Sequence, residues 1–238
     1  MTDLRDNRSY YDTFSATYDE GRDKGYHAYL DEAEFALVRP HLAGASVLEV
    51  GCGTGLILER LAALAEEAVG IDLSPGMLEH ARARGLQVLE GSATALPFED
   101  ARFDLVCSFK VLAHVEEIER ALTEMARVVR PGGRGILEFY NAHSLRALVK
   151  RLGPSGGIGT SGDTDESDVY TRFDRLSDIE AYLPDALRIV RVDGIRTLTP
   201  MAAFFGLPGW GALERLVSRT PLKRFGGFLV LTLERSAP

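Results

Sequence analysis

The chain has 238 residues, 45% of them hydrophobic and 26% charged, which suits one soluble domain with a well-buried core. No uninterrupted apolar stretch approaches the roughly 20 residues that cross a bilayer, and the polar N-terminus lacks the apolar core of an export signal. We therefore expect a cytoplasmic protein without a transmembrane segment. The formal net charge of -8 disfavours a nucleic-acid partner, because binding phosphates requires a basic face, and it favours a small-molecule partner.

The first 140 residues contain short apolar runs that alternate with amphipathic helical patterns. This alternation predicts a parallel sheet with crossover helices. The expected strands are residues 46–50, 68–71, 86–89, 103–108 and 135–140, and the expected helices are residues 54–65, 75–84 and 116–129.

The C-terminal hundred residues are less regular. Residues 153–170 are rich in Gly, Ser, Thr and Asp and predict a mobile loop. Ser177 and Glu180 then have the spacing of a capping box ahead of a short helix. Two further strands, 188–197 and 227–234, are expected to form an antiparallel, hairpin-like end to the sheet.

Residues 199–226, between these last two strands, are too long and too apolar for a simple turn and are interpreted as an insertion near the acceptor side. The segment combines apolar bulk with four basic residues. It could wall a hydrophobic pocket, touch a membrane surface, form a subunit interface or pack in the core. The chain is accordingly expected to be a monomer or a homodimer, with peripheral membrane contact left open.

A glycine-rich turn lies between the first strand and the following helix, in the sequence VLEVGCGTG of residues 47–55. Gly51, Gly53 and Gly55 let the backbone turn sharply and approach a ligand closely, at the edge where open α/β sheets bind theirs. Asp72 ends the next strand about 20 residues later, where a carboxylate can accept hydrogen bonds from a ribose diol. Alone, the glycines could serve packing and Asp72 could merely flank a helix, but together they predict a nucleoside site.

Glu49 helps to decide which nucleoside cofactor the turn binds. A dinucleotide would place its pyrophosphate there, and a carboxylate two residues before Gly51 would repel it. S-adenosylmethionine instead presents a cationic amino group. The dinucleotide fingerprint also requires glycine at position 56, which is Leu56. The pattern therefore favours S-adenosylmethionine over a nicotinamide cofactor.

Four ordered motifs, VLEVGCGTG, VGIDLSPGML, ALPFEDARFDLVCSFKVLAHV and VRPGGRGILEF, resemble those of class I S-adenosylmethionine-dependent methyltransferases. With the segment YYDTFSATYD of residues 10–19, they are most similar to the branch of ubiquinone and menaquinone biosynthesis methyltransferases. The resemblance implies a Rossmann-like, doubly wound α/β fold with a mostly parallel seven-stranded sheet, an antiparallel C-terminal strand and helices on both faces. It covers roughly residues 8–140 of a single methyltransferase domain, 1–238.

The resemblance also implies positions for the cofactor. Gly51 to Gly55, including Cys52 and Thr54, would surround the methionine moiety, with Asp72 on the ribose. The remaining cofactor-side candidates are Leu73 and Met77 on the purine face, Ser92 and Ala93 at the adenine edge, and Phe109 and Lys110 near the methionine end. Ser92 departs from the Asp that many members carry.

His114 follows the fourth strand and is the best candidate for a general base. Alternatively it packs beside Val115 and caps backbone. The related O-methyltransferases carry acidic residues near this histidine that help to bind a metal, but Lys110 and Ala113 stand at those positions here, so we expect no metal.

The N-terminal segment 1–40 is expected to form a helical lid over the cofactor. An aromatic ring near a sulfonium gains cation–π attraction, and Tyr18 is the first choice for this contact and for a part in catalysis. Candidates for the acceptor cavity are Tyr11, Phe14, His114, Tyr140, Asn141, Tyr170 and Arg172.

The expected function is direct in-line transfer of a methyl group from S-adenosylmethionine to an oxygen or nitrogen of a small, aromatic or hydrophobic acceptor such as a quinone precursor. Two alternatives remain. A non-catalytic adenosyl-binding protein would keep the fold and lose the chemistry, and a nicotinamide-dependent oxidoreductase would use the same sheet edge.

Overall fold

A computed structural model describes residues 7–152 and 169–237 of the chain. The loop expected at 153–170 therefore lies almost wholly outside the described residues. None of the described helices is both long and apolar enough to cross a bilayer.

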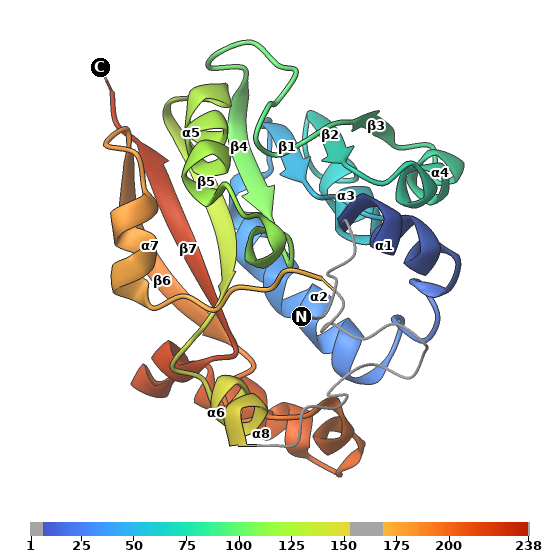
Figure 1. Ribbon diagram of the computed structural model, residues 1–238, viewed down its shortest axis with the longest axis vertical. Coiled ribbons are helices and arrows are strands. Elements are labelled where there is room, and N and C mark those ends of the chain that lie inside the picture. Colours follow the sequence, from blue (N-terminus) through green and yellow to red (C-terminus); the bar gives the residue numbers. More distant parts are fainter. Residues whose placement is uncertain (1–6, 153–168, 238) are drawn as a thin grey trace.

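Seven strands form one twisted sheet in the order β3-β2-β1-β4-β5-β7-β6 (Figure 1). Their bounds are β1 Ser46–Val50, β2 Glu67–Asp72, β3 Gln87–Glu90, β4 Phe103–Ser108, β5 Val129–Tyr140, β6 Leu187–Ile195 and β7 Phe228–Arg235. The first five strands pair in parallel, and β7 runs antiparallel to both of its neighbours, β5 and β6. The expected sheet, with its antiparallel C-terminal end, is confirmed.

Helices cover both faces of the sheet because adjacent residues of a strand point to opposite sides. The α-helices are α1 Asn7–Phe14, α2 Gly25–Val38, α3 Leu56–Ala62, α4 Pro75–Ala83, α5 Ile118–Val128, α6 Leu145–Leu152, α7 Leu176–Tyr182 and α8 Trp210–Val217. Val47 of β1 packs in a core with α2 and α3, whereas its neighbour Leu48 packs in a second core with α5 and α7. Because β2 and β4 both pair in parallel with β1, the carboxyl ends of these three strands lie at one edge of the sheet.

Two local predictions differ from the structure. The capping box expected at Ser177 and Glu180 is wrong, because α7 begins one residue before Ser177, and the Asp178 carboxylate accepts a hydrogen bond from the Arg175 backbone N–H at 2.9 Å. Strand β5 also begins at Val129, six residues before the expected start. There the chain pairs with Phe103 of β4 ahead of a register shift, so Gly132 and Gly133 lie within the strand rather than before it.

The segment 199–226 folds into η5 (Ala202–Gly206), α8 and η6 (Pro221–Phe225) between the last two strands. The N-terminal segment folds into α1, η1 (Ser15–Thr17) and α2. Helix α1 contacts α4, and η5 contacts α2, so both segments approach the same edge of the sheet.

Candidate active site

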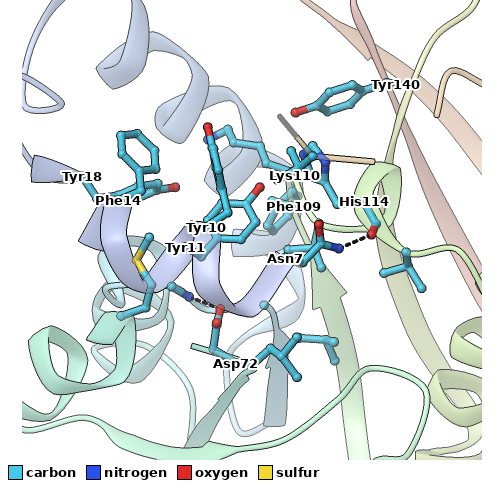
Figure 2. Close-up of a pocket in the computed structure, with 18 of the residues that line it drawn as sticks. Asn7, Tyr10, Tyr11, Phe14, Tyr18, Asp72, Phe109, Lys110, His114 and Tyr140 are labelled. Carbon is cyan, nitrogen blue, oxygen red and sulfur yellow. Dashed lines mark hydrogen bonds between the residues drawn. The ribbon is translucent and has the colours of Figure 1, made fainter. Parts of the chain in front are cut away.

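A cavity of about 870 Å³ opens at the carboxyl ends of the central strands, beneath α1. In Figure 2, Phe14 and Tyr18 of the N-terminal segment lie at the left and Tyr10 and Tyr11 in the centre. Asp72 lies below them, and His114 and Tyr140 lie at the right. Of the residues expected at the site, those that line the cavity are Tyr11, Phe14, Tyr18, Gly51, Gly53, Asp72, Leu73, Met77, Ser92, Ala93, Phe109, Lys110, His114, Tyr140 and Tyr170. Such a volume is in the range of pockets that hold drug-sized ligands.

The three glycines of the turn after β1 differ in what a side chain at each position would meet. A Cβ on Gly51 would lie 2.1 Å from Cγ2 of Val111, a cavity-lining residue. A Cβ on Gly53 would meet nothing within 4 Å, and Gly53 faces the cavity. A Cβ on Gly55 would lie 2.4 Å from Cδ1 of Leu86, so this glycine allows close packing of α3. Gly55 is not a lining residue, and neither are Cys52 and Thr54 of the same turn.

Asp72 is tied to the glycine turn by hydrogen bonds. Its carboxylate accepts from the backbone N–H of Gly53 at 2.8 Å and from that of Ser74 at 2.9 Å. Burial raises the pKa of Asp72, although the Ser74 and Gly53 amides oppose that shift by stabilising the charged form. The carboxylate is thus held in one place at the cavity wall, as a group that recognises a diol must be.

The expected adenine edge, Ser92 and Ala93, lies in the cavity wall after β3. The Ser92 hydroxyl lies 2.8 Å from Oγ1 of Thr94 and also accepts the backbone N–H of Thr94 at 3.2 Å. Ser92 therefore orders the local turn in addition to facing the cavity.

Helix α1 is fastened over the cavity mainly by Asp12. The Asp12 carboxylate accepts from the Ser74 hydroxyl at 2.5 Å and from the Gly76 backbone N–H at 3.0 Å, at the N-terminus of α4. A Cβ on Gly76 would lie 2.7 Å from the Ser15 hydroxyl oxygen, so the close contact requires glycine. The hydrogen bond from Ser74, followed by that from Gly76, lowers the pKa of Asp12.

A second fastening uses Asp19, just after η1. Its carboxylate accepts from the Thr54 hydroxyl at 2.6 Å and pairs with Arg84 at 2.7 Å. Thr54 thus holds the N-terminal segment to the glycine turn.

Replacement of Asp12 by Ala is expected to loosen α1. The pKa of Asp12 is lowered in the folded protein. Its contribution to stability is therefore present above the ordinary aspartate pKa and is lost as pH falls through the lowered value. Amide hydrogen exchange in α1 should therefore become faster in Asp12→Ala at neutral pH, while exchange in β1 and β4 stays slow. Asp23→Ala, which removes an exposed carboxylate, is the control. Unchanged exchange in α1 would show that Asp12 does not hold it.

His114 lies in η3 (Leu112–His114) and is 7% exposed. Its Nδ1 lies 2.9 Å from the Tyr170 carbonyl oxygen, which can only accept, so Nδ1 carries the proton and the basic lone pair is on Nε2. The ring makes edge contacts with Tyr11 at 6.0 Å and Tyr140 at 5.7 Å between centroids. Asn7 donates to the His114 backbone carbonyl at 2.7 Å, which joins α1 to this side of the cavity (Figure 2).

Two residues expected at the acceptor side do not line the cavity. Asn141 is buried and donates to the backbone carbonyls of Arg224 and Gly226 at 2.9 and 2.8 Å, so it holds η6 to the end of β5. Arg172 pairs with Asp174 at 3.0 Å and lies over the Tyr182 ring.

The side chain of Lys110 ends in a buried cluster of charged groups. Its Nζ lies 2.8 Å from Asp31 and 3.0 Å from the Glu34 carboxylate, both on α2. Burial opposes the charge of Lys110, but Glu34 and Asp31 outweigh it and raise its pKa. Two further carboxylates belong to this region, Glu49 of β1 and Glu138 of β5, and burial raises the pKa of both.

The motifs gave no sign of Arg22 and His27, which also line the cavity. Arg22 stacks on the Tyr18 ring at 4.2 Å. Burial, followed by the charges of Arg22 and Lys110, lowers the pKa of His27 to about 4, so this imidazole is neutral at neutral pH. The only sequence signal was their place in the polar stretch after the aromatic segment, which does not distinguish them from surface residues.

Several polar atoms near the glycine turn fit an amino-acid zwitterion. Glu49, although expected at the cofactor, is not among the residues that line the cavity. Its Oε2 is buried without a hydrogen-bond partner among the described residues, and so are Nε of Arg22 and Nδ1 of His27, which do line it. An ammonium group would supply what the carboxylate lacks, and a carboxylate would supply what Arg22 lacks. Together with the cavity above Gly53 and the fixed Asp72, these atoms fit S-adenosylmethionine, whose methionine part carries both charges.

Comparisons with known proteins agree with this fit. Residues 48–137 match the methyltransferase domain family. Within residues 48–137, the chain carries this methyltransferase domain. S-adenosylmethionine is the cofactor of this family.

Two curated relatives and one solved structure illustrate the similarity. A probable S-adenosylmethionine-dependent methyltransferase of Mycolicibacterium smegmatis is 37% identical over 93 residues, 38% of this chain and 36% of that protein. A demethylmenaquinone methyltransferase of Thermobifida fusca is 29% identical over 195 residues, 78% of this chain and 80% of that protein. The crystal structure of a possible histamine N-methyltransferase of Thermotoga maritima superposes with a TM-score of 0.70 at 21% identity, covering 97% of this chain and 99% of that one. The chain spans only about a third of the length of the Mycolicibacterium relative.

Proposed function

We propose that this methyltransferase moves a methyl group from S-adenosylmethionine to an oxygen or nitrogen atom of a small aromatic or hydrophobic acceptor. The observation that carries the proposal is the arrangement of one covered cavity. Asp72 and the glycine turn form one side of it, and His114, between Tyr11 and Tyr140, forms the other.

The proposed role of each lining residue follows from its position in the cavity. When bound, S-adenosylmethionine supplies a methyl group already activated by the positive sulfur. Asp72 would hold the ribose, Ser92 and Ala93 would flank the adenine, and Tyr18 would offer its ring to the positive charge. The N-terminal segment excludes water and holds the acceptor in line, and His114 takes the acceptor's proton on Nε2.

A quinone-like or other aromatic acceptor fits the remaining walls. Tyr11, Tyr140 and Phe228 line the cavity beyond His114. Such rings offer apolar and edge-to-face contacts to a flat substrate. The name of the Thermobifida relative, a demethylmenaquinone methyltransferase, points to the same class of compound.

Glu49 should make cofactor binding depend on pH. Burial, followed by the nearby Glu34, raises its pKa well above the usual value, so below that raised pKa the carboxyl carries a proton. The proton must leave before the group can attract an ammonium. Affinity for S-adenosylhomocysteine should therefore rise with pH as the Glu49 carboxyl loses its proton, with proton release in calorimetry. Glu49→Gln should remove the slope, and an identical slope in this variant would contradict the assignment.

The activity is tested by incubating the protein with S-adenosylmethionine bearing a deuterated methyl group and a panel of phenols, amines and carboxylates. We expect a labelled phenol or amine by mass spectrometry. Tight S-adenosylhomocysteine binding without transfer to any acceptor would favour a non-catalytic adenosyl-binding protein.

A further inference from the structure

Helix α8, in the segment between β6 and β7, exposes its leucines and buries its acid. Leu213 and Leu216 are 42% and 62% exposed, whereas Glu214 is fully buried. The Glu214 carboxylate accepts from the Leu198 backbone N–H at 3.0 Å and from the Thr199 hydroxyl at 2.5 Å. These bonds fix the orientation of α8, so its leucines cannot turn inward without breaking them.

Other apolar side chains of the same segment are also exposed. Leu207, Leu222 and Phe225 are 52%, 50% and 39% exposed. Phe205 packs on Tyr26 and Tyr29, but core packing does not explain the exposed leucines of residues 199–226. An apolar surface of this kind marks a place where another surface binds.

The charge of the segment indicates what binds there. Residues 199–226 contain four basic residues and one acid, the buried Glu214, in a chain whose formal net charge is -8. Lys223 pairs with Asp193 at 2.9 Å. Arg215, Arg219 and Arg224 are exposed, and within the described part of the chain none of them forms an ion pair.

We propose that the α8 surface, comprising Leu213, Leu216, Arg215 and Arg219 with the neighbouring exposed residues of 199–226, docks on an anionic lipid bilayer. Leucines enter the interface between headgroups and acyl chains, and arginines pair with lipid phosphates. An anionic bilayer accommodates both the exposed leucines and the exposed arginines of the segment.

The docked surface adjoins the cavity. Met201, Ala202 and Ala203 precede α8, line the cavity and are themselves exposed. A chain resting on a bilayer through α8 would therefore bring its cavity wall near the lipid. This consequence rests on the proposed function, because it concerns how a hydrophobic acceptor reaches the site.

Vesicle co-sedimentation tests the docking without using activity. We expect the full chain to sediment with phosphatidylglycerol vesicles and not with phosphatidylcholine vesicles, and to be released by high salt. Leu213→Ser/Leu216→Ser and Arg215→Gln/Arg219→Gln should each lower the partition coefficient about tenfold or more. The matched control, Leu64→Ser/Arg82→Gln, changes an exposed leucine and arginine near α3 and α4 and should bind like the wild type.

Thermal unfolding and S-adenosylhomocysteine affinity, measured on the same samples, show that each variant is folded, and separate failure of docking from failure of the proposed function. No sedimentation of the wild-type chain with anionic vesicles would overturn the proposal. Equal binding by the wild type and both α8 variants would also overturn it. So would a wild-type dimer that the α8 changes convert to monomers without any effect on vesicle binding.

Discussion

Asp72→Ala is expected to weaken the binding of S-adenosylhomocysteine about tenfold or more, because hydrogen bonds to a charged carboxylate contribute about 1.5–3 kcal/mol. The carboxylate is held by the backbone N–H groups of Gly53 and Ser74, so its acceptor oxygens are already oriented at the cavity wall. Ligand binding therefore does not have to order a mobile side chain. Isothermal titration calorimetry measures the change directly.

The control for Asp72 lies at the other end of the same strand. Glu67→Ala removes a carboxylate that pairs with Arg102 at 2.5 Å, away from the cavity, and should leave the affinity unchanged. Thermal unfolding separates a lost ligand contact from a disturbed glycine turn. An affinity that stays the same in a folded Asp72→Ala protein would refute the ribose assignment.

His114→Gln is expected to lower the single-turnover rate of methyl transfer about a hundredfold or more with the acceptor found in the labelled-methyl assay, because general-base catalysis contributes about 10²–10⁴. His114→Asn should show a similar loss, although its amide can still donate to the Tyr170 carbonyl as Nδ1 does. Comparison of the two variants therefore distinguishes the role of the basic lone pair on Nε2 from that of the structural hydrogen bond made by Nδ1.

S-adenosylhomocysteine affinity should stay within about twofold in both His114 variants, since the histidine lies on the acceptor side. Turnover that persists in His114→Gln would assign the ring to packing between Tyr11 and Tyr140.

The central sheet could be predicted from the sequence because each of its strands is a local pattern followed by a helix. VLEVGCGTG marks β1 and its turn, and the next acid, Asp72, marks the end of β2. Parallel strands then place both at the same edge without further information. The structure brings the two together in one hydrogen bond.

The acceptor side was harder to predict because its residues come from distant segments. His114 is positioned by the carbonyl of Tyr170 and touched by Asn7, residues 56 and 107 positions away in the chain. Asn141 was expected to face the cavity but turns to the carbonyls of η6, because a buried amide must satisfy its donors. Long-range pairings of this kind leave no periodic pattern.

The fastening of α1 by Asp12 has a consequence for the rate at which the enzyme completes its cycle. The helix lies over the cavity, and its carboxylate binds the N-terminus of α4, next to Met77 in the cavity wall. We expect departure of the spent nucleoside and entry of a fresh one to require both hydrogen bonds to break. We therefore expect exchange of the used cofactor, rather than the methyl step, to limit steady-state turnover once the true acceptor is saturating.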